Sequence, residues 1–130
     1  MAYLLDTSIA IYLREGSASV VDRVDALPRK PFLSVVTRVE LEGGVYAKPD
    51  EQDERRLAVD ALLNMLPLLD FDFDMSETYG HIVAQSGFSR RKIIDRMIAA
   101  TALVANMTLI TTNGDDFADI QGLQLMVWDA

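Results

Sequence analysis

Five short apolar runs recur along the chain, and most of the stretches between them have helical character. The runs lie at residues 3–5, 32–35, 67–69, 108–111 and 125–128. Strands separated by helical stretches predict crossover connections, and therefore a mostly parallel sheet covered by helices on both faces. The sequence thus predicts an α/β fold in which helix is the dominant element by length.

The expected helices follow from apolar periodicity and from residues that start or stop a helix. They are residues 9–14, a segment from Ser17 or Ser19 to Leu27, residues 37–47, a helix whose start carries the acids of residues 50–53, and residues 76–86 and 94–105. The fourth of these helices has a strong amphipathic stripe, which is typical of a helix with one side on the core. The stripe consists of Leu57, Ala58, Ala61, Leu62 and Met65.

The chain has 130 residues, the size of one domain, and we expect a single domain over residues 1–130. It has no cysteine and one histidine, His81, which excludes a disulfide scaffold and a thiolate metal site and disfavours zinc or histidine chemistry. The formal net charge of −8 excludes a uniformly basic nucleic-acid binder. The apolar runs are too short to cross a bilayer and the start has no basic signal segment, so we expect a cytoplasmic protein without a membrane partner.

Several acids lie where an open α/β sheet keeps its chemistry, beyond the carboxyl ends of the strands. Asp6 follows the first strand, Glu40 comes after the second, and Asp115 and Asp116 follow the fourth. Asp95 begins the apolar side of the last long helix, and buried acids are rare unless they are paired or bound to a metal. These positions predict that carboxylates from different elements meet at one edge of the sheet.

Each acid also has a purely structural interpretation. Asp6 is typical of a helix cap, and acids such as Asp115 and Asp116 are common in a turn after Asn113 and Gly114. Glu40 lies on a helix side that is otherwise apolar or small, where plain solvation is poor.

The basic residues near these acids leave a second alternative open, since each of them could form an ordinary ion pair. Asp95 could pair with Arg91 or Arg96 or simply favour the helix N-terminus, and Arg38 could pair with Glu42 or a nearby acid.

The conjunction of the acids favours a shared site over these separate interpretations. Carboxylates crowded together raise one another's pKa unless a cation neutralises them. An all-oxygen site without histidine or cysteine suits Mg²⁺ or Mn²⁺, which orient water and stabilise charge developing on a phosphodiester. The set therefore predicts a metal-dependent phosphodiesterase.

Four segments in order resemble the PIN-domain ribonucleases, and among them the VapC-type toxins of bacterial toxin–antitoxin modules. They are LLDTS at 4–8, SVVTRVELEG at 34–43, DRMIAATA at 95–102 and LITTNGDDF at 109–117. The resemblance runs over nearly the whole chain.

The resemblance implies a three-layer α/β/α sandwich and a metal-dependent endoribonuclease. Asp6, Glu40, Asp95 and a fourth acid, Asp116, would hold one or two Mg²⁺ or Mn²⁺ ions. Thr7 would help position the first acid or a metal-bound water, and Asn113 would be a polar helper.

The same resemblance implies partners. They are a second copy of the chain in a homodimer, a cognate VapB-like antitoxin that also provides any DNA binding, and a transfer RNA or another structured RNA as substrate.

Other functional classes remain open at this point. Residues 70–74, DFDFD, superficially resemble the paired aspartates of haloacid-dehalogenase phosphatases but lie too late in the chain. A receiver-like domain would need an acidic pair near the first strand and a late lysine, and neither is evident. A non-catalytic domain that sequesters a partner would need no metal, so substitution of Asp6 would leave its activity unchanged.

Overall fold

The computed structural model describes residues 1–130 and contains a five-stranded sheet in which every strand pair is parallel. The strands are β1 (Tyr3–Leu5), β2 (Phe32–Ser34), β3 (Leu68–Leu69), β4 (Thr108–Thr111) and β5 (Leu125–Val127). Their order across the sheet is β3-β2-β1-β4-β5. The first strand therefore lies at the centre, with neighbours that come from distant parts of the sequence.

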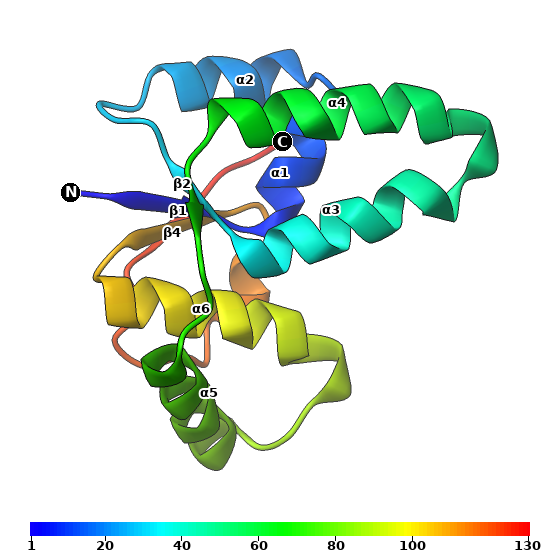
Figure 1. The fold of residues 1–130 in the computed structure, drawn as a ribbon. Coiled ribbons are helices and arrows are strands. Elements are labelled where there is room, and N and C mark those ends of the chain that lie inside the picture. The colour runs from blue at the N-terminus through cyan, green and yellow to red at the C-terminus, as the bar shows by residue number, and fades with distance from the viewer.

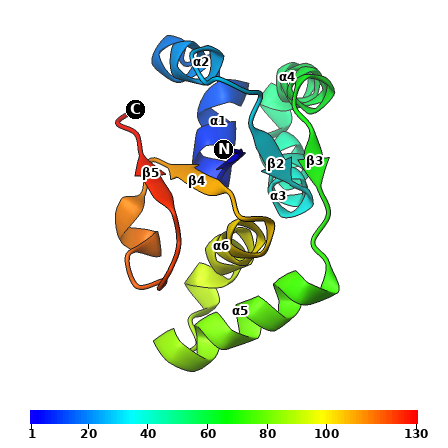
Figure 2. The same ribbon diagram turned by 90° about the vertical axis from the view of Figure 1, so that its left-hand side faces the viewer.

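Six α-helices cover the two faces of this sheet (Figures 1 and 2). One face carries α1 (Thr7–Arg14), α2 (Ala18–Asp25), α3 (Val35–Ala47) and α4 (Gln52–Met65), and the other carries α5 (Phe73–Ser86) and α6 (Ile93–Ala105). Short 3₁₀ turns complete the chain at η1 (Pro49–Glu51), η2 (Arg90–Lys92) and η3 (Gly114–Phe117). The predicted three-layer α/β/α sandwich with a parallel sheet is confirmed.

The central strand supplies side chains to both cores because successive residues of a strand point to opposite faces. Tyr3 and Leu5 pack into a cluster with α1 to α4, whereas Leu4 packs into the cluster formed with α5 and α6. Leu4 and Leu5 are both completely buried. An apolar run without alternation is thus explained by a strand that is covered on both sides.

Three helices begin two or three residues before the predicted positions because a polar side chain caps each of them. The side chains of Asp6, Ser34 and Asp72 accept hydrogen bonds from backbone N–H groups in the first turns of α1, α3 and α5. Val35, which the sequence predicts in the second strand, is therefore the first residue of α3.

The apolar stripe of α4 faces the core only in part. Leu57 and Met65 are 73% and 60% exposed. Leu62 of the stripe is buried, and the buried side of α4 also carries Val59 and continues to Leu66, neither of which belongs to the predicted stripe. Apolar periodicity indicates that a helix has an apolar side, but it does not distinguish a core from a surface that another chain could cover.

None of the helices combines the length and the apolar character that a membrane span requires.

Candidate active site

Asp6 lies at the carboxyl end of β1 and is only 2% exposed. Its Oδ1 accepts hydrogen bonds from Ser8 Oγ at 2.6 Å and from the backbone N–H of Ile9 at 3.0 Å. Its Oδ2 accepts a hydrogen bond from Thr111 Oγ1 at 2.5 Å. Asp6 therefore caps α1 with one oxygen and directs the other toward the end of β4.

Burial raises the pKa of Asp6, while the hydrogen bonds from Ser8, Thr111 and the backbone act in the opposite direction. The donors stabilise the carboxylate where it stands, so its position is fixed before any ligand arrives.

Asp95 lies in the first turn of α6 and is half-buried. Burial and, after it, the nearby carboxylates of Asp116, Asp6 and Glu40 together raise its pKa to about 6, while Arg91 opposes them. The other three predicted acids therefore all act on Asp95 through space, although the four come from separate parts of the chain.

Asp95 does not form the ion pairs that the structural interpretation required. Arg91 instead donates to Asp116 Oδ1 at 3.3 Å, and the buried Arg96 donates to Asp119 Oδ2 at 3.3 Å. No protein donor lies within hydrogen-bond distance of the Asp95 carboxylate.

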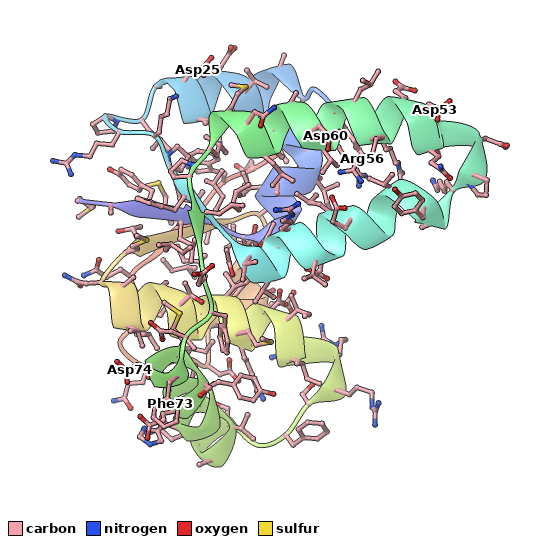
Figure 3. All side chains as sticks on the ribbon, viewed as in Figure 1. Asp25, Asp53, Arg56, Asp60, Phe73 and Asp74 are labelled. Atoms are coloured by element: carbon pink, nitrogen blue, oxygen red, sulfur yellow. The ribbon has the colours of Figure 1, made fainter.

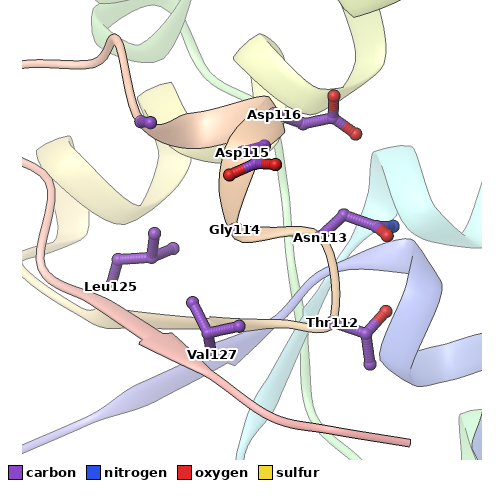
Figure 4. Close-up of a pocket in the computed structure, with 8 residues that line it drawn as sticks. Thr112, Asn113, Gly114, Asp115, Asp116, Leu125 and Val127 are labelled. Carbon is purple, nitrogen blue, oxygen red and sulfur yellow. The ribbon is translucent and has the colours of Figure 1, made fainter.

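Asp115 and Asp116 differ in their surroundings although they are adjacent in η3. Asp115 is exposed and its carboxylate has no hydrogen-bond partner, whereas Asp116 is half-buried and pairs with Arg91. Figure 4 shows Asn113 and Asp116 pointing toward the side of α1 and α3. Asp116 also raises the pKa of Asp95 more than any other charged group does.

Glu40 is exposed on α3, so the expectation that its surroundings oppose solvation is wrong. Glu42 pairs with Arg56 of α4 through two hydrogen bonds, of 3.0 Å and 2.6 Å. The side chain of Arg56 lies between α3 and α4 (Figure 3), and its hydrogen bonds lower the pKa of Glu42. Glu42 thus joins two helices, while Glu40 remains free to face the other acids.

The hydroxyl group of Thr7 does not reach Asp6. Its Oγ1 lies 3.0 Å from Thr37 Oγ1, and both residues are buried. Thr7 therefore links the start of α1 to α3, and the hydroxyl groups that hold Asp6 belong to Ser8 and Thr111.

Sequence reasoning missed Ser8 and Thr111 as supports of the first acid. The parallel register pairs Leu5 with Ile110, so the next residues of the two strands, Asp6 and Thr111, lie side by side. Thr111 Oγ1 also accepts the backbone N–H of Asn113 at 2.9 Å, which connects Asp6 to the η3 turn.

The donor chemistry of the site suits a hard divalent cation, because every candidate ligand atom is a carboxylate oxygen. Burial and the crowding of carboxylates raise the pKa of Asp95, and a cation bound among them would oppose both effects. The structure has no group of three or more His, Cys, Asp or Glu side chains already arranged to hold a metal ion. The acids thus fit the cation by chemistry and electrostatics, and their side chains would have to move together to bind it.

A PIN-domain family model matches residues 3–123. The chain belongs to the PIN-domain family. The tRNA(fMet)-specific endonuclease VapC of Shigella flexneri is 30% identical over 132 residues, with 98% of each chain covered. The ribonuclease VapC2 of Rickettsia felis is 27% identical over 136 residues, with 99% of each chain covered.

Comparison with solved structures supports the same family assignment. The chain matches a crystal structure of VapBC2 from Rickettsia felis bound to a promoter DNA fragment with a TM-score of 0.87 and 27% identity, covering 99% of this chain and 100% of that one. It also matches VapBC-1 from nontypeable Haemophilus influenzae with a TM-score of 0.80 and 28% identity, covering 98% of each chain. The resemblance to VapC-type PIN domains is therefore confirmed in both sequence and structure.

Proposed function

We propose that this protein is a metal-dependent endoribonuclease that acts as the toxin of a toxin–antitoxin pair. The observation that carries the proposal is the electrostatic convergence of Asp6, Glu40 and Asp116 on Asp95 at the carboxyl edge of the sheet. Two similar proteins are named ribonuclease or endonuclease, which supports the same reaction class.

The contacts of the proposed metal ligands support a different role for each of them. Asp6 is the fixed ligand, because Ser8, Ile9 and Thr111 hold both of its oxygens. Asp95 is the ligand that most needs a cation, because burial and like charges raise its pKa to about 6.

The remaining candidates complete the proposed site. Glu40 and Asp116 close it from α3 and η3, Asn113 is a minor polar helper, and Thr7 acts only through the start of α1. A bound Mg²⁺ or Mn²⁺ ion would supply an oriented, acidified water and neutralise charge on the phosphodiester.

The test is RNA cleavage by purified protein, with and without Mg²⁺, Mn²⁺ or EDTA. Asp6→Asn, Glu40→Gln and Asp95→Asn are expected to abolish cleavage while circular dichroism stays unchanged. Asp22→Asn removes an equal charge from the exposed surface of α2 and is expected to cleave like the wild type. Full cleavage in EDTA by a preparation free of other nucleases would overturn the mechanism.

The choice of Asp116 as the fourth acid has its own test. Asp116→Asn is expected to slow single-turnover cleavage more than Asp115→Asn at every Mg²⁺ concentration, and less than Asp95→Asn, because Asn113 or water can replace a fourth ligand in part. The reverse order of the two η3 variants would show that the assignment is wrong.

We also propose a VapB-like antitoxin as a protein partner. An apolar groove of about 320 Å³ runs between α1, α2 and α4, and its walls include Leu13, Val24, Ala61 and Met65. Residues of the α4 stripe, among them Ala61 and Met65, form one wall. The similar Rickettsia and Haemophilus structures are VapBC complexes. An apolar segment of the antitoxin is expected to fill this groove.

Growth assays test the partner. Expression of the chain alone is expected to arrest growth, and co-expression of a small protein encoded beside it is expected to restore growth. Met65→Asp should weaken the rescue without reducing RNA cleavage. Harmless expression of the wild type in a host without an antitoxin would contradict the toxin function, and arrest by Asp6→Asn would favour a partner-sequestering domain.

We propose further that the protein is a homodimer in the cytoplasm that cuts a transfer RNA or another structured RNA, and that any DNA binding belongs to the antitoxin. The exposed Val39 and Tyr46 of α3 and Phe73 of α5 offer apolar surface to a second copy. A net charge of −8 excludes a uniformly basic surface of the kind that a general DNA-binding protein presents. Light scattering measures the oligomeric state, and sequencing of RNA 5′ ends after a brief pulse of expression identifies the RNA.

A further inference from the structure

The largest hollow on the surface lies beside the acidic site and shares Asn113 and Asp116 with it, whereas its other lining residues have no role in the proposed chemistry. It has a volume of about 590 Å³ and opens between η3 and the carboxyl end of β5 (Figure 4). Volumes of about 300–1,000 Å³ are typical of small-ligand pockets. Asp116 borders the hollow, so an occupant would lie next to the acids.

The walls of this hollow combine apolar and polar groups. Leu125 and Val127 of β5 form an apolar side, and Val127 is 53% exposed although it is apolar. Asp115 contributes a carboxylate that has no hydrogen-bond partner, whereas the hydroxyl group of Thr112 is bonded to Ser8. An apolar wall beside a free hydrogen-bond acceptor suits a flat, uncharged ring with N–H donors on its edge.

The position of Gly114 is required for the close approach of η3 to β5. A Cβ atom at this position would lie 2.8 Å from Val127 Cγ2, which is closer than real Cβ contacts. Glycine therefore lets the turn rest against the apolar wall.

The hollow is connected to the first acid by a short chain of hydrogen bonds. Thr112 Oγ1 donates to Ser8 Oγ at 3.0 Å, and Ser8 Oγ donates to Asp6 Oδ1 at 2.6 Å. The edge of the hollow and the fixed carboxylate thus belong to one rigid unit. A group bound in the hollow would have a defined position relative to the acids.

The charge of Asp115 decides which part of a nucleic acid can enter. A free carboxylate repels phosphate and accepts hydrogen bonds from base amino groups. The ring N–H of uracil can also donate to a carboxylate, but it lies between two carbonyl oxygens, which the carboxylate repels. Bases with an exocyclic amino group are therefore favoured over uracil. Unpaired bases of RNA are splayed out, packed on side chains and recognised along their edges.

We propose that the hollow between η3 and β5 receives one unpaired base next to the cleaved bond, and that Asp115 selects bases with an exocyclic amino group over uracil. The proposal rests on the ribonuclease function above. It assigns the choice of cleavage position to a residue outside the catalytic set.

A single-stranded RNA library with randomised positions tests the proposal. Sequencing of the 5′ ends after cleavage gives the base frequencies on each side of the cut. For wild-type protein, we expect guanine, adenine and cytosine to exceed uracil at one adjacent position by at least about fivefold, the lower end for one specific base contact. Asp115→Asn should flatten this preference, because an amide can also donate to the carbonyl oxygens of uracil. Asp22→Asn, with the same loss of charge on α2, should keep the preference.

A binding measurement separates recognition from catalysis. In the inactive Asp95→Asn background, fluorescence anisotropy is expected to show weaker binding of an oligonucleotide with uracil at that position. Adding Asp115→Asn should remove the difference, while Val127→Ala should weaken binding of all four bases and the exposed control Val104→Ala should not.

The outcomes distinguish the two proposals. A wild type that cleaves no RNA would refute the ribonuclease function itself. Cleavage with the same base preference in Asp115→Asn, or with no preference in the wild type, would refute the base site and leave the ribonuclease function intact.

Discussion

Asp6 and Asp95 lie on opposite sides of the same acidic site and are held in opposite ways. Asp6 is buried between β1 and β4, and three donors satisfy its two oxygens. Asp95 is half-buried on α6, accepts no protein hydrogen bond and faces three other carboxylates. Burial raises the pKa of both groups, but only Asp6 receives hydrogen bonds that compensate for it.

An aspartate side chain can therefore stabilise the fold at one position and destabilise it at another position nearby. Asp6 contributes a helix cap and joins two strands, so the fold benefits from its carboxylate without any metal. Asp95 contributes mainly repulsion until a cation arrives, because its charged form is partly desolvated and close to like charges.

The largest expected effect is that substitution of either acid abolishes cleavage, whereas the two substitutions change the free energy of unfolding in opposite directions. Asp6→Ala and Asp95→Asn should both reduce cleavage to background. Without metal at pH 7.5, Asp6→Ala should lower the free energy of unfolding by about 1–2 kcal/mol, because a cap is lost. Asp95→Asn should raise it by about 1 kcal/mol, because repulsion is relieved. Urea unfolding measures both.

Added Mg²⁺ sharpens this prediction. The ion binds the folded site, so it should stabilise the wild type and have little effect on either variant. Equal destabilisation by both substitutions would contradict the contrast between the two acids.

The pH dependence of the free energy of unfolding tests the raised pKa of Asp95 separately. Its pKa is about 6 in the folded chain, against an ordinary value of 3.8, so the folded state binds a proton first as the pH falls. The metal-free wild type should therefore gain about 1 kcal/mol relative to Asp95→Asn between pH 7.5 and pH 5, after allowance for solvent screening. Asp116, Asp6 and Glu40 raise this pKa and Arg91 lowers it. A constant difference between the two proteins across this range would contradict the raised pKa.

Much of the fold could be predicted because its strands are buried on both faces and stand out as apolar runs. Each of the five runs contains a strand of the sheet, with ends that differ by at most one residue. The helix starts were less accurate because capping by Ser34 and Asp72 depends on side-chain contacts. The buried side of α4 is shifted from its predicted stripe, because Leu57 and Met65 face outward while Val59 and Leu62 are buried.

The acids of the candidate site could be singled out because each follows a strand or begins a helix. Their supports could not, because Thr111 reaches Asp6 only through the parallel register of β1 and β4. Thr7 is adjacent to Asp6 in sequence, yet its hydroxyl group pairs with Thr37. Register and side-chain direction, which sequence spacing does not contain, decide which hydroxyl group supports the acid.

Two matched threonine variants test this conclusion. Their expected effects are smaller than those of the acid variants. Thr111→Val removes the hydrogen bond to Asp6 Oδ2 and should lower metal affinity or cleavage about 10- to 100-fold, the range for groups that orient a ligand. Thr7→Val removes a hydrogen bond to Thr37 and should change stability more than the Mg²⁺ dependence of cleavage. Mg²⁺ titrations of single-turnover cleavage compare them. A larger shift in the Thr7 variant would restore Thr7 as the support of the acid.

The smallest expected effect concerns Arg91, the one cation that opposes the raised pKa of Asp95. Its ion pair with Asp116 spans 3.3 Å and its side chain is 71% exposed, so Arg91→Ala should change the free energy of unfolding by less than about 0.5 kcal/mol. The same substitution removes a positive charge from the edge of the acidic site. The metal-free variant should therefore begin to gain stability at a slightly higher pH than the wild type, and 0.5 M NaCl should reduce this difference because salt screens exposed charges. Arg90→Ala removes an equal charge from the same turn and is the matched control. A large loss of stability in Arg91→Ala alone would mean that the Asp116 side of the site is held as firmly as Asp6, and the contrast between the two sides would fail.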